Sequence, residues 1–139
     1  MTSTDTIATL AEELQQFTDW EDRYAHIIAM GKELAPYPEE FRIDQFLVAG
    51  CQSRVWLYPT WIEGRLEFHA DSEAIVVKGL VAILMRIYNH RTPQEILDIP
   101  NDFVSTLDLD THLSQNRTSG LAAMIKQIGL YALAFSPRK

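Results

Sequence analysis

The sequence has almost no cysteine and no long hydrophobic run. Its 139 residues include one cysteine, Cys51, and a single thiol cannot form a disulfide within the chain. This composition agrees with a reducing compartment and leaves one thiol free for chemistry. Because no apolar run approaches the ~20 residues that cross a bilayer, we expect neither a membrane span nor a membrane partner.

Basic residues are also few. The chain has 12 Lys and Arg against 19 Asp and Glu, a formal net charge of -7. Binding to nucleic acid depends largely on basic side chains that neutralise phosphates, so nucleic acid is not an expected partner. The first ten residues contain neither a basic segment nor a long apolar core, and nothing in them is typical of a secretion signal. We therefore expect a cytoplasmic protein.

Motifs for metals and nucleotides are missing as well. A metal site needs three or four convergent ligands, often at short sequence spacings. No such spacing joins Cys51 to the four histidines, which are His26, His69, His90 and His112. The glycine-rich patterns of nucleotide-binding loops do not occur either. We expect no metal and no bound cofactor.

What the chain does have is the length and the hydrophobic fraction, 47%, of one globular domain. A single domain over residues 1–139 is expected. Apolar residues at three- and four-residue spacing predict amphipathic helices. The predicted helices cover residues 4–17, 18–34 and 73–88, a short segment from residue 92, and a long final segment from residue 118 or 119.

Local signals indicate where these helices begin. Thr18, in a capping box with Glu21, and Ser72 are the expected N-caps of the second and third helices. Thr92 precedes a proline at the first helical position, a combination that starts the short helix. Gly79 lies inside the third helix, where we expect it to permit close packing.

Between the second and third helices the pattern changes to short runs rich in β-branched and aromatic residues. These runs predict three strands, at residues 46–49, 54–61 and 65–69. Glu63 and Gly64 supply a turn signal, so the second and third strands should form an antiparallel hairpin, with Pro59 at an edge or a bulge. Cys51 is thereby placed on a tight loop at the end of a sheet.

The surroundings of Cys51 allow several interpretations. Free cysteine is often a small buried hydrophobe, but a preceding glycine and the following Gln52 and Ser53 suit a turn that displays its side chain. Arg54 could favour the thiolate or point into solvent. A cysteine hydrolase would need a base, for which His69 and His112 are candidates.

The stretch GCQSRVW, residues 50–56, resembles the cysteine motif of the SufE family of sulfur-acceptor proteins. Four further stretches resemble the family in its order and at about its spacing. They are WEDRYAHIIAMG (20–31), DSEAIVVKGLVA (71–82), TPQEI (92–96) and RTSGLAAM (117–124). Together the five motifs cover roughly residues 19 to 135, and they are far more specific than a lone cysteine.

The resemblance implies an α/β fold of the α+β type, similar to the IscU-type scaffolds, with a small three-stranded antiparallel sheet packed against a layer of helices. It also implies a role. SufE-like proteins accept sulfane sulfur from a pyridoxal-phosphate cysteine desulfurase (SufS-like), stimulate that enzyme, and pass the sulfur to an iron-sulfur scaffold complex (SufBCD-like). The carrier itself needs no cofactor and is not a stand-alone enzyme.

Family positions in this sequence receive roles through the same resemblance. Cys51 is the sulfur-accepting residue, and Gly50, Gln52 and Ser53 belong to its loop. The polar positions expected near the loop or a docking surface are Asp71, Glu73 and Arg117. Glu73 replaces an aspartate of some relatives, and Ala70 stands where relatives often have glycine. Neither difference affects the sulfur chemistry.

Two alternatives stay open at this point. One is a noncatalytic adaptor of a desulfurase complex, in which Cys51 only packs, and the other is a cysteine-dependent hydrolase. A homodimer is open as well. If the protein is a carrier, apolar residues at 46–49 and 55–57 should shield Cys51 in the free protein and raise its pKa.

Overall fold

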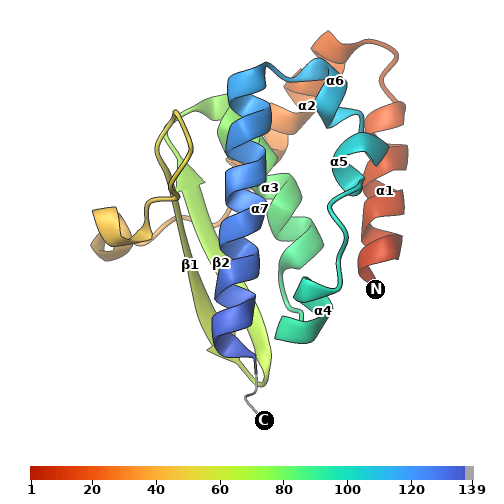
Figure 1. Cartoon of the computed structure of the whole chain (residues 1–139). Helices are drawn as coiled ribbons and strands as arrows, with labels where there is room; N and C mark the ends of the chain where they lie inside the picture. Colours follow the sequence, from red (N-terminus) through yellow and green to blue (C-terminus); the bar gives the residue numbers. More distant parts are fainter. Residues whose placement is uncertain (137–139) are drawn as a thin grey trace.

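An antiparallel hairpin forms the sheet that the structure describes (Figure 1). The structure is a computed structural model that describes residues 1–136, and within them β1 (Val55–Ile62) pairs with β2 (Arg65–Ser72) over their whole length. Glu63 and Gly64 connect the strands with φ angles of 50° and 82°. Two successive left-handed residues are typical of a type I′ turn, so the predicted hairpin and its turn are confirmed.

The segment predicted as a first strand, residues 46–49, forms one bridge instead of a strand. Leu47 bridges Trp56, and the Val48 N–H donates to the Val55 carbonyl oxygen at 2.9 Å. A 3-10 turn precedes this contact, and Gly50, at φ 91°, turns the chain away after it. The mixed fold with a small antiparallel sheet on helices is confirmed, but in residues 1–136 the sheet has two strands rather than three.

Helices make up most of the remaining chain. They are α1 (Ser3–Gln15), α2 (Trp20–Lys32), α3 (Ile75–Tyr88), α4 (Pro93–Leu97), α5 (Phe103–Thr106), α6 (Leu109–His112) and α7 (Gln115–Phe135), with 3-10 turns η1 (Glu39–Phe41) and η2 (Asp44–Phe46). The first three predicted helices and the short helix after Thr92 are confirmed. The sequence pattern did not predict α5 and α6, which are only four residues long.

Several helix starts differ from the prediction. Asp19 rather than Thr18 caps α2, and its side chain accepts from the Asp22 N–H at 2.9 Å. Ser72 ends β2, so α3 begins three residues later without a side-chain cap. α7 begins one turn earlier than expected because Ser114 caps it.

The helix α3 lies at the centre of the core, against α2, β2, α1 and α7. Its residues Leu80, Ile83 and Ile87 are fully buried. A Cβ atom at Gly79 would lie 2.3 Å from the Ile27 carbonyl oxygen of α2, so the two backbones are in close contact. The predicted packing role of Gly79 is confirmed.

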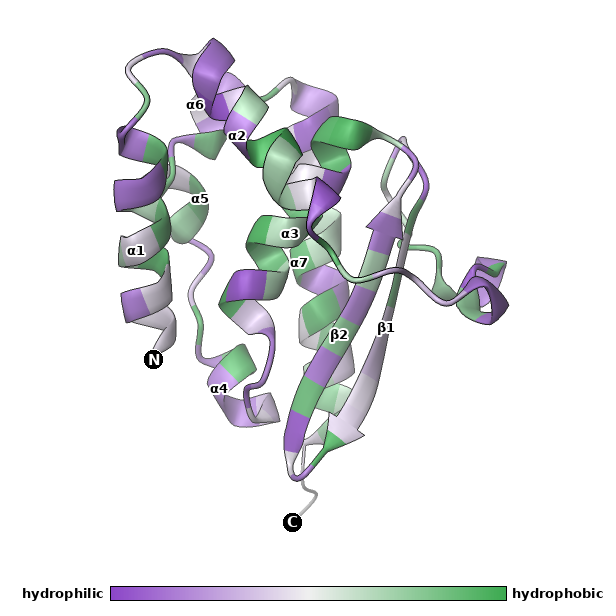
Figure 2. Ribbon diagram, turned by 180° about the vertical axis from the view of Figure 1, so that it is seen from behind, coloured by the Kyte–Doolittle hydropathy of each residue, from purple (hydrophilic) through white to green (hydrophobic). Residues whose placement is uncertain are grey.

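The hairpin is covered on both faces. Side chains alternate along β2, and Figure 2 shows this as alternating hydrophilic and hydrophobic residues. One face, with Leu57 and Phe68, packs in the main core under the helices. Residues 37–47, which we call the strap, cover Trp56 and Tyr58 on the other face. The strap leads through Val48 into residues 49–54, which we call the Cys51 loop.

Candidate functional site

The thiol of Cys51 lies between the Cys51 loop and helix α7. It is half-buried, and its Sγ atom donates a weak hydrogen bond to the Gly120 carbonyl oxygen at 3.5 Å. Burial raises the pKa of the Cys51 thiol, because an apolar environment disfavours the charged thiolate. Cys51 is thus partly shielded in the free protein, but residues 46–49 and 55–57, which were expected to shield it, do not line the pocket beside it.

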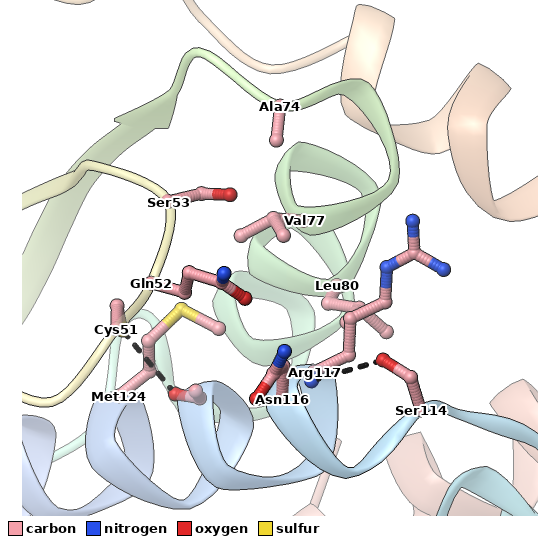
Figure 3. Close-up of a pocket in the computed structure, with 11 residues that line it drawn as sticks. Cys51, Gln52, Ser53, Ala74, Val77, Leu80, Ser114, Asn116, Arg117 and Met124 are labelled. Carbon is pink, nitrogen blue, oxygen red and sulfur yellow. Dashed lines mark hydrogen bonds between the residues drawn. The ribbon is translucent and has the colours of Figure 1, made fainter.

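A pocket of about 360 Å³ opens beside this thiol (Figure 3). Three segments that are far apart in the sequence contribute to it: the Cys51 loop, the start of α3 and the start of α7. Its lining residues are Cys51, Gln52, Ser53, Ala74, Val77, Leu80, Ser114, Asn116, Arg117, Gly120 and Met124. The wall next to α3 is apolar, while the rim at α7 is polar. The pocket can hold a small apolar group next to the sulfur.

Gly50 allows the loop to lie close to α7, and Gly120 faces the thiol from the helix. Gly50 adopts φ 91°, and a Cβ atom there would lie 3.3 Å from the Ala123 Cβ. A Cβ atom at Gly120 would lie 3.8 Å from the Cys51 sulfur, an ordinary van der Waals distance. The predicted role of Gly50 in shaping the loop thus has a conformational reason, because side chains rarely tolerate its φ.

Arg54 and Glu73 form an ion pair near the end of the Cys51 loop. An Arg54 nitrogen lies 3.0 Å from a Glu73 oxygen, and the Arg54 guanidinium also lies over the Trp56 ring, 5.3 Å from its centroid. Both charged side chains are exposed, and neither residue lines the pocket. The positive charge of Arg54 is therefore engaged by Glu73 rather than directed at the thiol.

Asp71 lies at the end of β2, outside the pocket. Its carboxylate oxygens contact Arg42 at 2.9 Å and Lys78 at 3.2 Å, and one of them accepts from the Ser72 N–H at 2.8 Å. Burial opposes ionisation of Asp71, but the hydrogen bonds from Arg42 and Lys78 outweigh it and lower its pKa. The Asp71 carboxylate is thus fixed by its partners near the loop, and it does not contact the thiol.

Arg117 lies in the first turn of α7 at the rim of the pocket. Its backbone N–H donates to the Ser114 hydroxyl at 3.3 Å, and its side chain is exposed. Figure 3 shows the guanidinium directed away from Cys51. Among residues 1–136, no carboxylate forms an ion pair with it. The positions predicted from the resemblance therefore separate: Gln52, Ser53 and Arg117 meet around Cys51, whereas Asp71 and Glu73 lie beyond the pocket.

Sequence reasoning missed the apolar part of the site. Val77, Leu80, Gly120 and Met124 line the pocket, and all four belong to two of the family-like motifs quoted above. Only the polar positions of those motifs were interpreted as functional. A signal was present in Gly120, a glycine inside a long helix, where its low helix propensity calls for a structural reason.

The two candidate bases of a hydrolase lie elsewhere. His69 stacks on Tyr58 with ring centroids 4.7 Å apart, and His112 stacks on Trp20 at 4.2 Å. No histidine lines the thiol pocket in the part of the chain that the structure describes. A thiol without a nearby base is a poor hydrolytic nucleophile, so the geometry does not support the hydrolase interpretation.

Residues 1–136 lack two further kinds of feature. No group of three or more His, Cys, Asp and Glu side chains is arranged so that it could hold a metal ion. No helix in this range has the length and apolar character that crossing a membrane requires.

Comparison with known proteins places the chain in a family. A model of the SufE domain, described as an Fe-S metabolism associated domain, matches residues 8–132. The fold is also similar to the solution structure of a hypothetical protein from Thermus thermophilus, with a TM-score of 0.78 and 17% sequence identity over 94% of this chain and 95% of that one. Since the family model covers most of the sequence, the chain belongs to the SufE family, whose domain is associated with iron-sulfur metabolism.

Proposed function

We propose that this protein is a sulfur carrier of iron-sulfur cluster assembly. Cys51 accepts sulfane sulfur from the persulfide of a pyridoxal-phosphate cysteine desulfurase, stimulates that enzyme by removing its product, and delivers the sulfur to a scaffold complex. One observation carries the proposal: the only thiol of the chain lies on a loop, half-buried beside a pocket of about 360 Å³.

The loading step is a thiolate exchange at sulfur. The Cys51 thiolate attacks the outer sulfur of the desulfurase persulfide, a new S–S bond forms on Cys51, and the S–S bond of the donor breaks. The desulfurase cysteine leaves as a thiolate, and it takes up the proton that Cys51 has lost. The exchange is redox-neutral and consumes no other reactant, so one accessible cysteine is sufficient.

The pocket suits the interval between loading and delivery. Val77, Leu80 and Met124 provide apolar contacts beside the thiol, and such surroundings keep water and reductants away from a bound sulfur. Delivery repeats the exchange, with a thiolate of the recipient attacking the outer sulfur and Cys51 leaving. Since burial raises the pKa of Cys51, the loop must move outward before the thiolate forms readily.

Incubation with a cognate desulfurase and cysteine, followed by mass spectrometry, tests the proposal. Wild type should gain the mass of one sulfur atom on Cys51, and Cys51→Ser should gain none and lose desulfurase stimulation. Ala134→Cys in the Cys51→Ser background is a matched control, because residue 134 is exposed near the far end of α7. A thiol there should remain unloaded.

The alternatives give different results in the same assay. An adaptor predicts that Cys51→Ser still stimulates the desulfurase and that wild type gains no sulfur. A hydrolase predicts turnover of an ester or amide without any desulfurase. Either result would contradict a carrier role for Cys51.

A further inference from the structure

The Cys51 loop has no regular structure of its own to hold it in place. Across residues 49–54, no residue belongs to a helix or strand. The Val48 to Val55 hydrogen bond, at 2.9 Å, joins the residues that flank the loop. Besides this bond and the bridge between Leu47 and Trp56, side-chain contacts tie the two legs of the loop to the sheet. Several of these contacts meet at two adjacent residues, Asp71 and Ser72.

Asp71 holds the leg that enters the loop. Arg42, on the strap, lies 2.9 Å from one Asp71 oxygen. The same guanidinium lies over the rings of Tyr37 and Trp56, 5.2 Å and 4.8 Å from their centroids. Arg42 therefore joins the strap to the outer face of the hairpin, and Asp71 supplies the charge that keeps it there.

Ser72 holds the leg that leaves the loop. Its hydroxyl is buried and donates to the Arg54 carbonyl oxygen at 2.9 Å, and it accepts from the Ala74 N–H at 3.3 Å. Asp71 in turn fixes this residue, because its carboxylate accepts from the Ser72 N–H at 2.8 Å. Lys78 of α3, 3.2 Å from the same carboxylate, ties the pair to the helix that lines the pocket.

We propose that Asp71 and Ser72 are positioning residues that clamp both legs of the Cys51 loop and so set how often the thiol becomes accessible. Neither residue touches the sulfur. The proposal rests on the proposed function only in that Cys51 is taken as the reacting group. The clamp joins side chains rather than a β-ladder, so the loop can open while the hairpin stays paired.

The contacts of Asp71 with its two cations are between charged groups, whereas those of the Ser72 hydroxyl are between neutral groups. The Asp71 side chain is 14% exposed and pairs with two cations, and hydrogen bonds between charged groups are stronger than neutral ones. The Ser72 to Arg54 hydrogen bond is between neutral groups and is partly buried. Removing the Asp71 charge should therefore open the loop more than removing the Ser72 hydroxyl.

The test is alkylation of Cys51 by iodoacetamide in the isolated, full-length protein. Asp71→Asn, which keeps the shape of the side chain, should label about tenfold faster than wild type, a ratio that corresponds to about 1.4 kcal/mol of opening free energy. Ser72→Ala should label faster by a smaller factor. Arg65→Gln is the matched control, since it breaks an ion pair with Glu95 away from the Cys51 loop and should not change the rate.

The pH profile separates positioning from general destabilisation. When the loop opens, the thiol loses the burial that raises its pKa, so the profile of alkylation against pH should move to lower pH in Asp71→Asn. Arg42→Gln should shift the profile in the same direction. The double variant Arg42→Gln, Asp71→Asn should add little to either change, because both substitutions remove the Arg42–Asp71 ion pair. Arg42→Gln also serves as the test if Asp71→Asn fails to fold.

Two outcomes would overturn the clamp. One is a wild-type rate and pH profile in Arg42→Gln and Ser72→Ala, and the other is an equal acceleration in Arg65→Gln. None of these measurements involves a desulfurase. A protein that never gains sulfur from the enzyme would contradict the proposed function and leave the clamp intact. A protein that gains sulfur, but whose Cys51 is alkylated at the wild-type rate in Arg42→Gln and Ser72→Ala, would contradict the clamp alone.

Discussion

The two ends of β1 are held in different ways. After the strand, the chain reverses through two residues, Glu63 and Gly64, whose left-handed φ angles define the turn by themselves. Before the strand, the six residues of the Cys51 loop contain one left-handed glycine, Gly50, and depend on side-chain contacts with the strap, β2 and α7. The backbone specifies the turn, whereas distant residues specify the loop, and only such a loop can open without unpairing the hairpin.

The largest effect on this comparison should come from the two glycines. An alanine forced into a left-handed φ costs about 1–3 kcal/mol, so Gly50→Ala and Gly64→Ala should both lower the free energy of unfolding in urea. Gly50→Ala should cost more, because its Cβ atom would lie 3.3 Å from the Ala123 Cβ, whereas nothing lies within 4 Å of a Cβ atom at Gly64.

Alkylation of Cys51 then distinguishes the two ends. We expect faster labelling in Gly50→Ala and wild-type labelling in Gly64→Ala. An equal change of the alkylation rate in both variants would mean that the loop and the turn are coupled. The two ends of β1 would then not be held independently.

The same contrast explains what the sequence could predict. The turn was predictable from Glu63 and Gly64, since it depends on local chemistry, and so were the amphipathic helices. The expected strand at residues 46–49 was wrong, because Phe46 packs against Tyr58 on the outer face and Leu47 makes only one bridge. A sequence pattern records that these residues are apolar, but it does not record which side of the sheet they cover.

The pocket was predictable only in part, for the same reason. Cys51 and its loop form a continuous motif that resembles a known family, so they could be identified directly. Gly120 and Met124 join the site because α7 crosses the loop in the folded chain. The contact of Asp71 with Arg42 joins residues far apart in the sequence, and neither residue shows a local pattern that indicates the other.

Acid should weaken the loop end of β1 more than its turn end. The pKa of Asp71 is lowered in the folded protein, so the unfolded chain binds this proton more readily. The ionised Asp71 carboxylate therefore stabilises the folded protein above the ordinary aspartate pKa of about 3.9. This contribution is lost as the pH falls through the lower pKa of the folded state. Between about pH 7 and 5, Asp71→Asn should be less stable than wild type by about 1–2 kcal/mol.

Urea unfolding of both proteins at a series of pH values measures this difference. It should shrink as the pH falls below about 4. Arg65→Gln, at the turn end, should differ little from wild type throughout, because its ion pair with Glu95 is about half-exposed and such pairs contribute about 0–1 kcal/mol. A difference for Asp71→Asn that stays constant with pH would exclude an electrostatic role for the carboxylate.

Two glycines of α7 allow a smaller and opposite effect. Gly→Ala in a helix interior adds about 0.5–1 kcal/mol of stability, and both Gly120→Ala and Gly129→Ala should show this gain. Only the first places a methyl group near the thiol, 3.8 Å from its sulfur, while nothing lies within 4 Å of a Cβ atom at Gly129. Gly120→Ala should therefore slow the alkylation of Cys51, and Gly129→Ala should leave it unchanged. Equal rates in all three proteins would mean that Gly120 does not control access to the sulfur.

The smallest effect on stability should come from Arg117, at the rim of the pocket. Its side chain is exposed and forms no ion pair within residues 1–136, so Arg117→Ala should change the free energy of unfolding by less than about 0.5 kcal/mol. Burial is the cause of the raised Cys51 pKa, and Arg117 does not offset it in the free protein. Alkylation of the isolated variant should accordingly match wild type.

A permanent positive charge at that rim can still act once a partner is bound, by attracting an acidic group or by stabilising the thiolate as it forms. Arg117→Ala should thus lower the rate of persulfide formation on Cys51 with a desulfurase, and that rate should depend less on salt than in wild type. Lys126→Ala, another exposed cation of α7, is the control and should keep both the rate and its salt dependence. If the rate of persulfide formation is unchanged in Arg117→Ala, Arg117 does not belong to the site. Control of Cys51 would then depend on the contacts of the Cys51 loop that are present in the free protein.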